Sequence, residues 1–301
     1  MSDSQMLTSR PPDDYIFGPG ANCTLESCDI EWSTYKYRPS LPANIVMLIL
    51  FTTAWNIHVV LGIRWKTVWF MNFMMIGCGS EIIGYIGRIL MWTNPFGFPG
   101  FMLQVIFITG GPVFFSAAIY ITLSVTIEQL APQLSRLRPV VFYWIFITAD
   151  IICIVLQASG GALSTVSYGA SEIGVKVALA GLAAQVIFLF SFSICFFDYM
   201  IRYYKTSTAP PMTSKLRTCF CFLALAFVCI FGRCCYRCYE LSQGYKNSTV
   251  ITNQGLFIGL EGALIVIAVF ALIVAHPGRM FREAKEPAEP TLEPESPCVE
   301  K

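Results

Sequence analysis

Apolar residues form seven long runs along the 301-residue chain, and polar residues gather between these runs. A helix that crosses a membrane needs about 20 mainly apolar residues. Short breaks rich in proline, glycine and asparagine separate the runs, as expected where helices end. The pattern therefore predicts an all-α integral membrane protein whose seven transmembrane helices span residues 42–62, 67–91, 101–127, 138–159, 174–197, 216–238 and 252–275.

The segments on either side of this helical region, residues 42–276, are polar. Residues 1–41 form a predicted N-terminal tail that lacks the apolar core of a secretory signal. Residues 277–301 repeat glutamate and proline and have no apolar face, so we expect a disordered tail.

Lysine and arginine are distributed unevenly between the two sides of the predicted bundle. With the N-terminus outside the cytosol, twelve of them fall in cytosolic segments and five in outer segments. Cytosolic loops carry the excess of positive residues, so the sequence predicts an extracytosolic N-terminus and a cytosolic C-terminus. Two N-x-[ST] sequences, at Asn22 and Asn247, then lie outside, where glycosylation occurs. The same location allows a short-loop disulfide between Cys23 and Cys28.

Composition excludes several classes of function. Hydrophobic residues make up 55% of the chain and charged residues only 13%, against about 25% charged in soluble domains. No basic patch suits nucleic acid, and no G-x-x-x-x-G-K-[ST] loop suits ATP. With only two histidines, three-ligand metal catalysis is not expected. We therefore predict neither an enzyme nor a cofactor or metal site.

Ionisable side chains inside the predicted spans are the candidates for function. A charged residue at the centre of a membrane helix costs about 2.5–3.5 kcal/mol on insertion scales, so such residues are usually functional. Several are spaced to share a helix face, at i, i+4 and i+7. The candidate ligand-binding residues, with uncharged neighbours, are Glu81, Tyr85, Arg88, Pro112, Tyr120, Asp150, Gln157, Arg233, Arg237, Glu240 and Glu261.

The depths of these residues suggest a shared site. At about 1.5 Å rise per residue, Glu81, Asp150 and Glu261 fall near mid-membrane, and the arginines lie toward the outer side. We interpret this set as a polar cavity that opens toward the outer half. The alternative is that the residues form structural salt bridges, such as Glu81 with Arg88 and Glu261 with Arg233. Pro112 kinks the third helix and frees a carbonyl, which protein or water must satisfy.

Several of these motifs together resemble the fungal RTA-like family, also called the lipid-translocating exporter family. The resemblance runs from about Tyr37 to Gly278. The matching positions are the run from Glu81 to Arg88, then Pro112, Ala117, Tyr120, Asp150, Gln157, Gly160, Gly161, Arg233, Tyr236, Arg237, Glu240, Glu261 and the closing His276-Pro277-Gly278.

The resemblance implies seven helices and a role in moving or releasing amphipathic lipids, such as sphingoid long-chain bases, across the plasma membrane. Resistance to toxic lipids or drugs would follow. A vacuolar or endosomal membrane fits the residues equally well. A carboxylate inside the bundle suits the protonated amine of such a base. A seven-helix receptor for an amphipathic ligand is the alternative function, and the sequence indicates no oligomeric state.

Overall fold

The computed structural model describes residue 20 and residues 22–130, 139–166, 172–206, 213–243 and 251–279. Within these ranges all regular structure is helical, and seven helical segments are long and apolar enough to cross a membrane. The predicted seven-helix membrane fold is therefore confirmed. The spans are α1 (Leu41–Trp65), α2 (Val68–Thr93), α3 (Phe98–Leu130), α4 (Pro139–Val166), α5 (Glu172–Lys205), α6 (Ser214–Ser242), and a composite seventh span of α7 (Gln254–Leu256), η4 (Phe257–Ala263) and α8 (Leu264–Val274).

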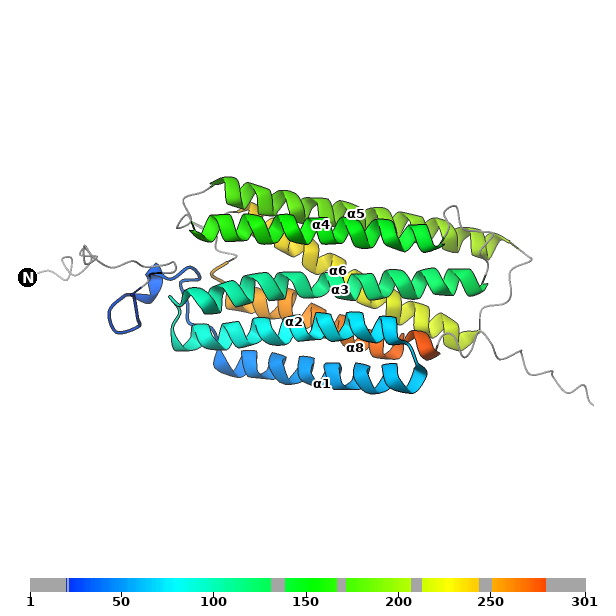
Figure 1. The fold of residues 1–301 in the computed structure, drawn as a ribbon, viewed down its shortest axis with the longest axis horizontal. Coiled ribbons are helices and arrows are strands. Elements are labelled where there is room, and N and C mark those ends of the chain that lie inside the picture. The colour runs from blue at the N-terminus through cyan, green and yellow to red at the C-terminus, as the bar shows by residue number, and fades with distance from the viewer. Residues whose placement is uncertain are drawn as a thin grey trace, which may run out of the picture.

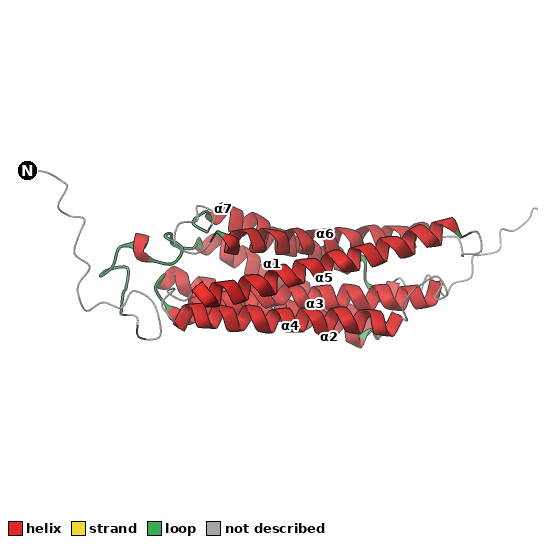
Figure 2. Cartoon of the chain, turned by 90° about the horizontal axis from the view of Figure 1, so that it is seen from above, coloured by secondary structure: helices red, strands yellow, loops and turns green. Residues whose placement is uncertain are grey.

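The helices lie roughly parallel in one elongated bundle (Figure 1). α1, α2 and α3 pack in chain order, and α4 and α5 form a tightly packed hairpin on the far side of α3. α6 crosses the bundle diagonally and packs mainly against α8, which also contacts α1. The bundle is seen from a second direction in Figure 2.

The helices end where the sequence stops favouring helical backbone. α1 ends at Trp65 because Lys66 turns into the left-handed region, with φ 56°, and its N–H returns to the carbonyls of Gly62 and Ile63. α2 ends before Asn94, which is extended and precedes Pro95, as residues before proline usually are.

The fifth helix is longer than predicted. Hydrophobicity alone placed its end at residue 197, but α5 continues to Lys205 and has 34 residues, which span about 51 Å. Its last turns are polar, and Asp198 and Arg202 form an ion pair at 3.1 Å on the helix surface. Such i, i+4 pairs stabilise a helix that has left the hydrocarbon layer.

Apolar side chains cover the outside of the bundle. Val60, Val155, Ile187 and Val228 are each more than 60% exposed. Exposed apolar area on this scale suits acyl chains as the solvent. The buried charged residues lie inside, away from this surface.

Glycines bring the backbones of α4 and α5 into contact. A Cβ at Gly160 would lie 2.6 Å from the Gly174 carbonyl oxygen and 2.9 Å from the Cα of Ala178, both backbone atoms. At the neighbouring Gly161, a Cβ would lie 3.7 Å from Val105, an ordinary contact. Close backbone approach at small residues is the usual way in which membrane helices associate.

This difference gives a stability prediction for two adjacent positions. We expect Gly160→Ala to lower the free energy of unfolding by about 1–3 kcal/mol, since the two backbones must separate. Gly161→Ala should leave it unchanged or raise it slightly. Thermal unfolding of the purified variants in detergent measures both, and equal transition temperatures for the two would contradict the predicted contact.

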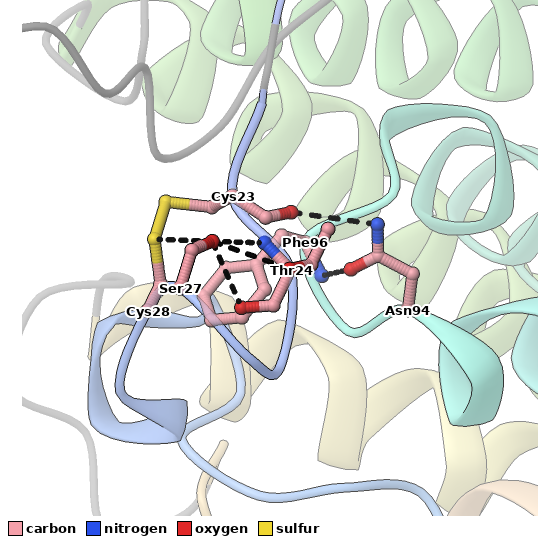
Figure 3. Close-up of a disulfide and its surroundings, with 6 residues drawn as sticks. All are labelled: Cys23, Thr24, Ser27, Cys28, Asn94 and Phe96. Atoms are coloured by element: carbon pink, nitrogen blue, oxygen red, sulfur yellow. Dashed lines mark hydrogen bonds between the residues drawn. A yellow bond between two sulfur atoms is a disulfide. The ribbon is translucent and has the colours of Figure 1, made fainter.

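The N-terminal segment, residues 22–40, packs against the end of the bundle where α1 begins. Cys23 and Cys28 form a disulfide, and both pack against Phe96 between α2 and α3. The Asn94 side-chain amide donates to the Cys23 carbonyl at 3.5 Å (Figure 3). Arg38 donates to the Trp92 carbonyl at 2.7 Å and lies over its ring.

Part of residues 1–41 is folded against the bundle, because the disulfide and Arg38 give the segment fixed contacts. Asn22 is exposed beside the disulfide. Asn247 lies outside the described residues, as does most of the predicted C-terminal tail, residues 280–301.

Candidate functional site

Pro112, inside α3, positions the first group of the site. Pro112 has no N–H, so the carbonyl of Ile108, four residues earlier, loses its helical hydrogen bond. Arg233 of α6 donates to this carbonyl at 2.5 Å. The side chain of Arg233 is only 2% exposed, and the freed carbonyl is satisfied by protein, as the sequence required.

Arg233 belongs to a buried ion network that joins α6 to the seventh span. The same guanidinium lies 3.1 Å from Glu261, whose other contact is Arg237 at 3.2 Å. Arg237 also pairs with Glu240 at 2.6 Å and donates to the Thr109 hydroxyl at 3.3 Å. The salt-bridge alternative is therefore present for Glu261 and Arg233.

Glu261 lies in a π-helical segment, η4, which the sequence did not reveal. π-helical turns inside α-helices are rare and are frequent at functional sites. Gly262 follows Glu261, and a Cβ there would lie 2.7 Å from the hydroxyl oxygen of Tyr85. Glycines at 255, 259 and 262 were the signal in the sequence that this span is irregular.

Glu81 of α2 lies beside the ion network with one oxygen unused. The residue is 1% exposed and close enough to Arg233 and Glu261 to interact with both electrostatically. Its Oε1 atom has no hydrogen-bond partner among the described residues. Gly111 makes room for it, since a Cβ there would lie 2.7 Å from Oε1. The hydroxyl of Tyr85, one turn along α2, is also buried without a partner.

The carboxyl groups of this group outnumber the arginines that form ion pairs there. Glu81, Glu240 and Glu261 contribute three carboxyl groups, and the ion-paired guanidinium groups are those of Arg233 and Arg237. Arg88 acts on Tyr85 electrostatically but forms no ion pair with a described carboxylate. A buried carboxylate is unfavourable unless a cation or hydrogen-bond donors compensate for it. The group therefore lacks one positive charge or proton, and Glu81 Oε1 is the atom left to receive it.

Arg88 lies apart from Glu81, although the two share a predicted helix face. Its guanidinium donates to neutral oxygens of three different segments and lies over the ring of Phe257 at 3.7 Å. Among the described residues Arg88 forms no ion pair, so the Glu81–Arg88 salt bridge is absent and Arg88 instead ties the N-terminal segment to the bundle. The acceptors are Tyr37 at 3.2 Å, Asn44 at 3.2 Å and Gln104 at 3.3 Å.

A second polar group lies along α4. The Tyr120 hydroxyl donates to Asp150 Oδ2 at 3.0 Å, and the ring of Tyr120 packs against Phe192. Two turns further, the Gln157 amide donates to Gln185 of α5 at 2.8 Å. Asp150 Oδ1 and Gln157 Oε1 are buried without hydrogen-bond partners in the described part of the chain.

Two small hollows lie in the half of the bundle that carries the N-terminal segment. The larger, of about 30 Å³, lies among α3, α4, α5 and α6, and Gln157 and Arg237 line it. The smaller, of about 10 Å³, is lined by Tyr35, Arg237 and Glu240.

These two hollows are not the cavity expected around Glu81, Asp150 and Glu261. None of those three lines either hollow; Glu261 pairs with Arg233 and Arg237, and Asp150 bonds to Tyr120. The structure thus brings Glu81, Tyr85, Pro112, Arg233, Arg237, Glu240 and Glu261 together, and places Arg88 and the α4 group separately.

Metal ligands are not assembled in the described residues, where no group of three or more His, Cys, Asp or Glu is placed to hold an ion. His58 and His276 are both buried, and His58 contacts the Val269 carbonyl at 3.3 Å. Neither histidine touches the ion network.

Comparison with known proteins places the chain in a family. The sequence signature described as "RTA1 like protein" matches residues 74–284. A sphingoid long-chain base transporter, RSB1, of Saccharomyces cerevisiae is 32% identical over 282 residues, covering 81% of this chain and 73% of the relative. Protein RTM1 of the same yeast is 23% identical, covering 87% and 97%. Protein RTA1 is 24% identical, covering 81% and 84%. No solved structure matches. The chain is a multi-pass membrane protein and belongs to the RTA1-like family.

Proposed function

We propose that this protein moves or releases single-chain amphiphiles that carry a protonated amine, such as sphingoid long-chain bases, across a membrane. The observation that carries the proposal is the buried Oε1 atom of Glu81. Among the described residues it has no hydrogen-bond partner, and it lies in a group of three carboxyl groups and two ion-paired arginines. An ammonium group supplies both the missing charge and the missing donors.

The relatives support the same ligand class. The yeast protein named as a sphingoid long-chain base transporter is 32% identical and matches over most of this chain. Resistance of cells to toxic lipids or drugs would follow from export of such amphiphiles. The sequence has no phosphate-binding loop, so we propose downhill, ion-coupled or partner-driven movement, at the plasma membrane.

The helices around Glu81 must separate before a lipid reaches it. Two elements with altered backbone hydrogen bonding flank this residue, the part of α3 around Pro112 and the π-helical segment η4. Irregular helical segments are where membrane helices bend with the smallest loss of backbone hydrogen bonds. We propose that these two elements allow the bundle to open and close around the amine.

Purified protein in liposomes tests the function. We expect a fluorescent long-chain base to cross the bilayer faster than in protein-free liposomes. Binding without movement would support the alternative, a seven-helix receptor or sensor, because the same site would then change conformation without passing its ligand on. Neither binding nor movement would contradict the proposal as a whole.

We also propose that the N-terminus lies outside the cytosol. Asn22 is exposed, so Asn22→Gln should remove an endoglycosidase-sensitive shift in electrophoretic mobility from protein made in fungal cells. Thr24→Ala, which destroys the same acceptor sequence and keeps Asn22, should remove the same shift. If an acceptor introduced after Lys205 is glycosylated instead, the orientation is the reverse.

A further inference from the structure

The larger hollow has the size and chemistry of a site for one small polar group. Its volume of about 30 Å³ exceeds the 10–15 Å³ or so that one water needs in the same measure. An acyl chain does not fit in it. Its walls near α4 and α5 are made of small side chains, including Ala158, Gly161, Ala162 and Ala178.

Gln157 gives this hollow one unused acceptor. The residue is 6% exposed, and its amide nitrogen is already committed to Gln185. The carbonyl oxygen Oε1 is buried and has no partner in the described residues. A buried acceptor without a donor is unfavourable by about 1–3 kcal/mol. A neutral O–H group satisfies it and fits the available volume.

Arg237 connects the hollow to the amine site. It lines the hollow, and it also contacts Glu261 of the ion network at 3.2 Å. Glu81 lies at the opposite side of α3, beside Gly111. The amine and the nearest hydroxyl of a sphingoid base are on adjacent carbon atoms, so one head group cannot occupy both places at once.

We propose that the hollow beside Gln157 is a second binding site for the head group, which is selective for hydroxylated amphiphiles. In this site, Gln157 Oε1 accepts a hydrogen bond from a hydroxyl group of the ligand. This inference rests on the proposed function, which supplies the ligand class. It adds a second location and a basis for discrimination. Glu81 recognises the charge of the ligand, and Gln157 recognises its hydroxyl groups.

Equilibrium binding to the protein in lipid nanodiscs tests this second binding site with three probes of increasing hydroxyl content. They are octadecylamine, which has none, sphinganine, which is a dihydroxy base, and phytosphingosine, which is a trihydroxy base. We expect Gln157→Leu to weaken phytosphingosine relative to octadecylamine by about 3- to 10-fold, the loss of one neutral hydrogen bond. Octadecylamine affinity itself should not change.

Two further variants distinguish the loss of this binding site from a general structural change in α4. Gly161→Ala adds a methyl group to the hollow without touching Gln157, and should reduce the same selectivity. Ser159→Ala removes an exposed hydroxyl that bonds to the Leu156 carbonyl, and should leave the selectivity unchanged. If Gln157→Leu and Gly161→Ala keep the wild-type ratio, the hollow holds only a resident water and the proposal is wrong.

The two proposals fail in different ways. Glu81→Gln should weaken octadecylamine most, because this probe carries the amine and has no hydroxyl group for the hollow beside Gln157. If it weakens none of them, the amine site is wrong, and the ratio between phytosphingosine and octadecylamine still tests Gln157. If Glu81→Gln weakens all three probes while Gln157→Leu leaves the ratio of phytosphingosine to octadecylamine affinity unchanged, only the proposed hydroxyl-binding site beside Gln157 is wrong.

Discussion

Arg233→Leu is expected to lower the free energy of unfolding by about 3–5 kcal/mol, the usual result of removing one partner from a buried ion pair. The change leaves Glu261 with one arginine, and it leaves the Ile108 carbonyl unpaired beside Pro112. The Ile108 carbonyl then has no donor and Glu261 has only Arg237, both in a low-dielectric interior. Thermal unfolding in detergent, or the yield of monodisperse protein, measures the effect.

The chain offers a matched control for this prediction. Arg202 pairs with Asp198 at the same distance, 3.1 Å, but both side chains are more than a third exposed. Arg202→Leu should cost less than about 1 kcal/mol, as exposed pairs do. The double variant Arg233→Leu with Glu261→Leu should recover part of the stability, because Glu261 no longer places a buried carboxylate beside a single arginine. Equal losses for Arg202→Leu and Arg233→Leu would show that burial does not set the strength of these pairs.

Glu81→Gln is expected to weaken binding of octadecylamine, a single-chain amine without a hydroxyl group, by about 10- to 100-fold, which corresponds to the loss of one charge-assisted hydrogen bond. The amide keeps the size of the side chain but removes the charge that pairs with the ammonium group. Binding to the protein in nanodiscs measures the change, and transport in liposomes should fall with it.

Two companion variants sharpen this prediction. Gly111→Ala places a methyl group against Oε1 of Glu81, so it should weaken binding although the charge is kept. Glu128→Gln makes the same chemical change at an exposed position near the end of α3, and should have no effect. Wild-type affinity in both Glu81→Gln and Gly111→Ala would place the amine elsewhere in the bundle.

The sequence predicted the spans well because lipid imposes a simple rule on composition. Every apolar run of about 20 residues became a helix, since backbone groups in lipid must be paired within the segment. This rule applies only to residues within the hydrocarbon layer of the membrane. It therefore missed the polar last turns of α5, where Asp198 and Arg202 extend the helix. It also missed the fold of residues 22–40, whose contacts depend on loops distant in sequence.

The sequence indicated which residues are candidates for the site, but it did not indicate which of them contact one another. Buried charges are rare enough that each of them could be identified from the sequence. Helical spacing suggested that Glu81 and Arg88 act together. However, Arg88 finds neutral acceptors on the N-terminal segment, α1 and α3, and Glu81 faces Arg233. Partners on other helices depend on how the helices pack, and a single sequence does not give that packing. The same holds for Gln157, whose neighbour Gln185 is on α5.

The backbone contacts at Gly160 and Gly174 also have a mechanical consequence. Two helices whose main chains touch cannot slide or bend independently, so α4 and α5 should move together as one rigid unit. The packing contacts of this hairpin with α3 and α6 are less extensive than those between α4 and α5. The larger hollow lies between the hairpin and these two helices. A motion that admits a lipid from the side is therefore expected to swing the whole hairpin outward as a rigid body, as in hinge movements.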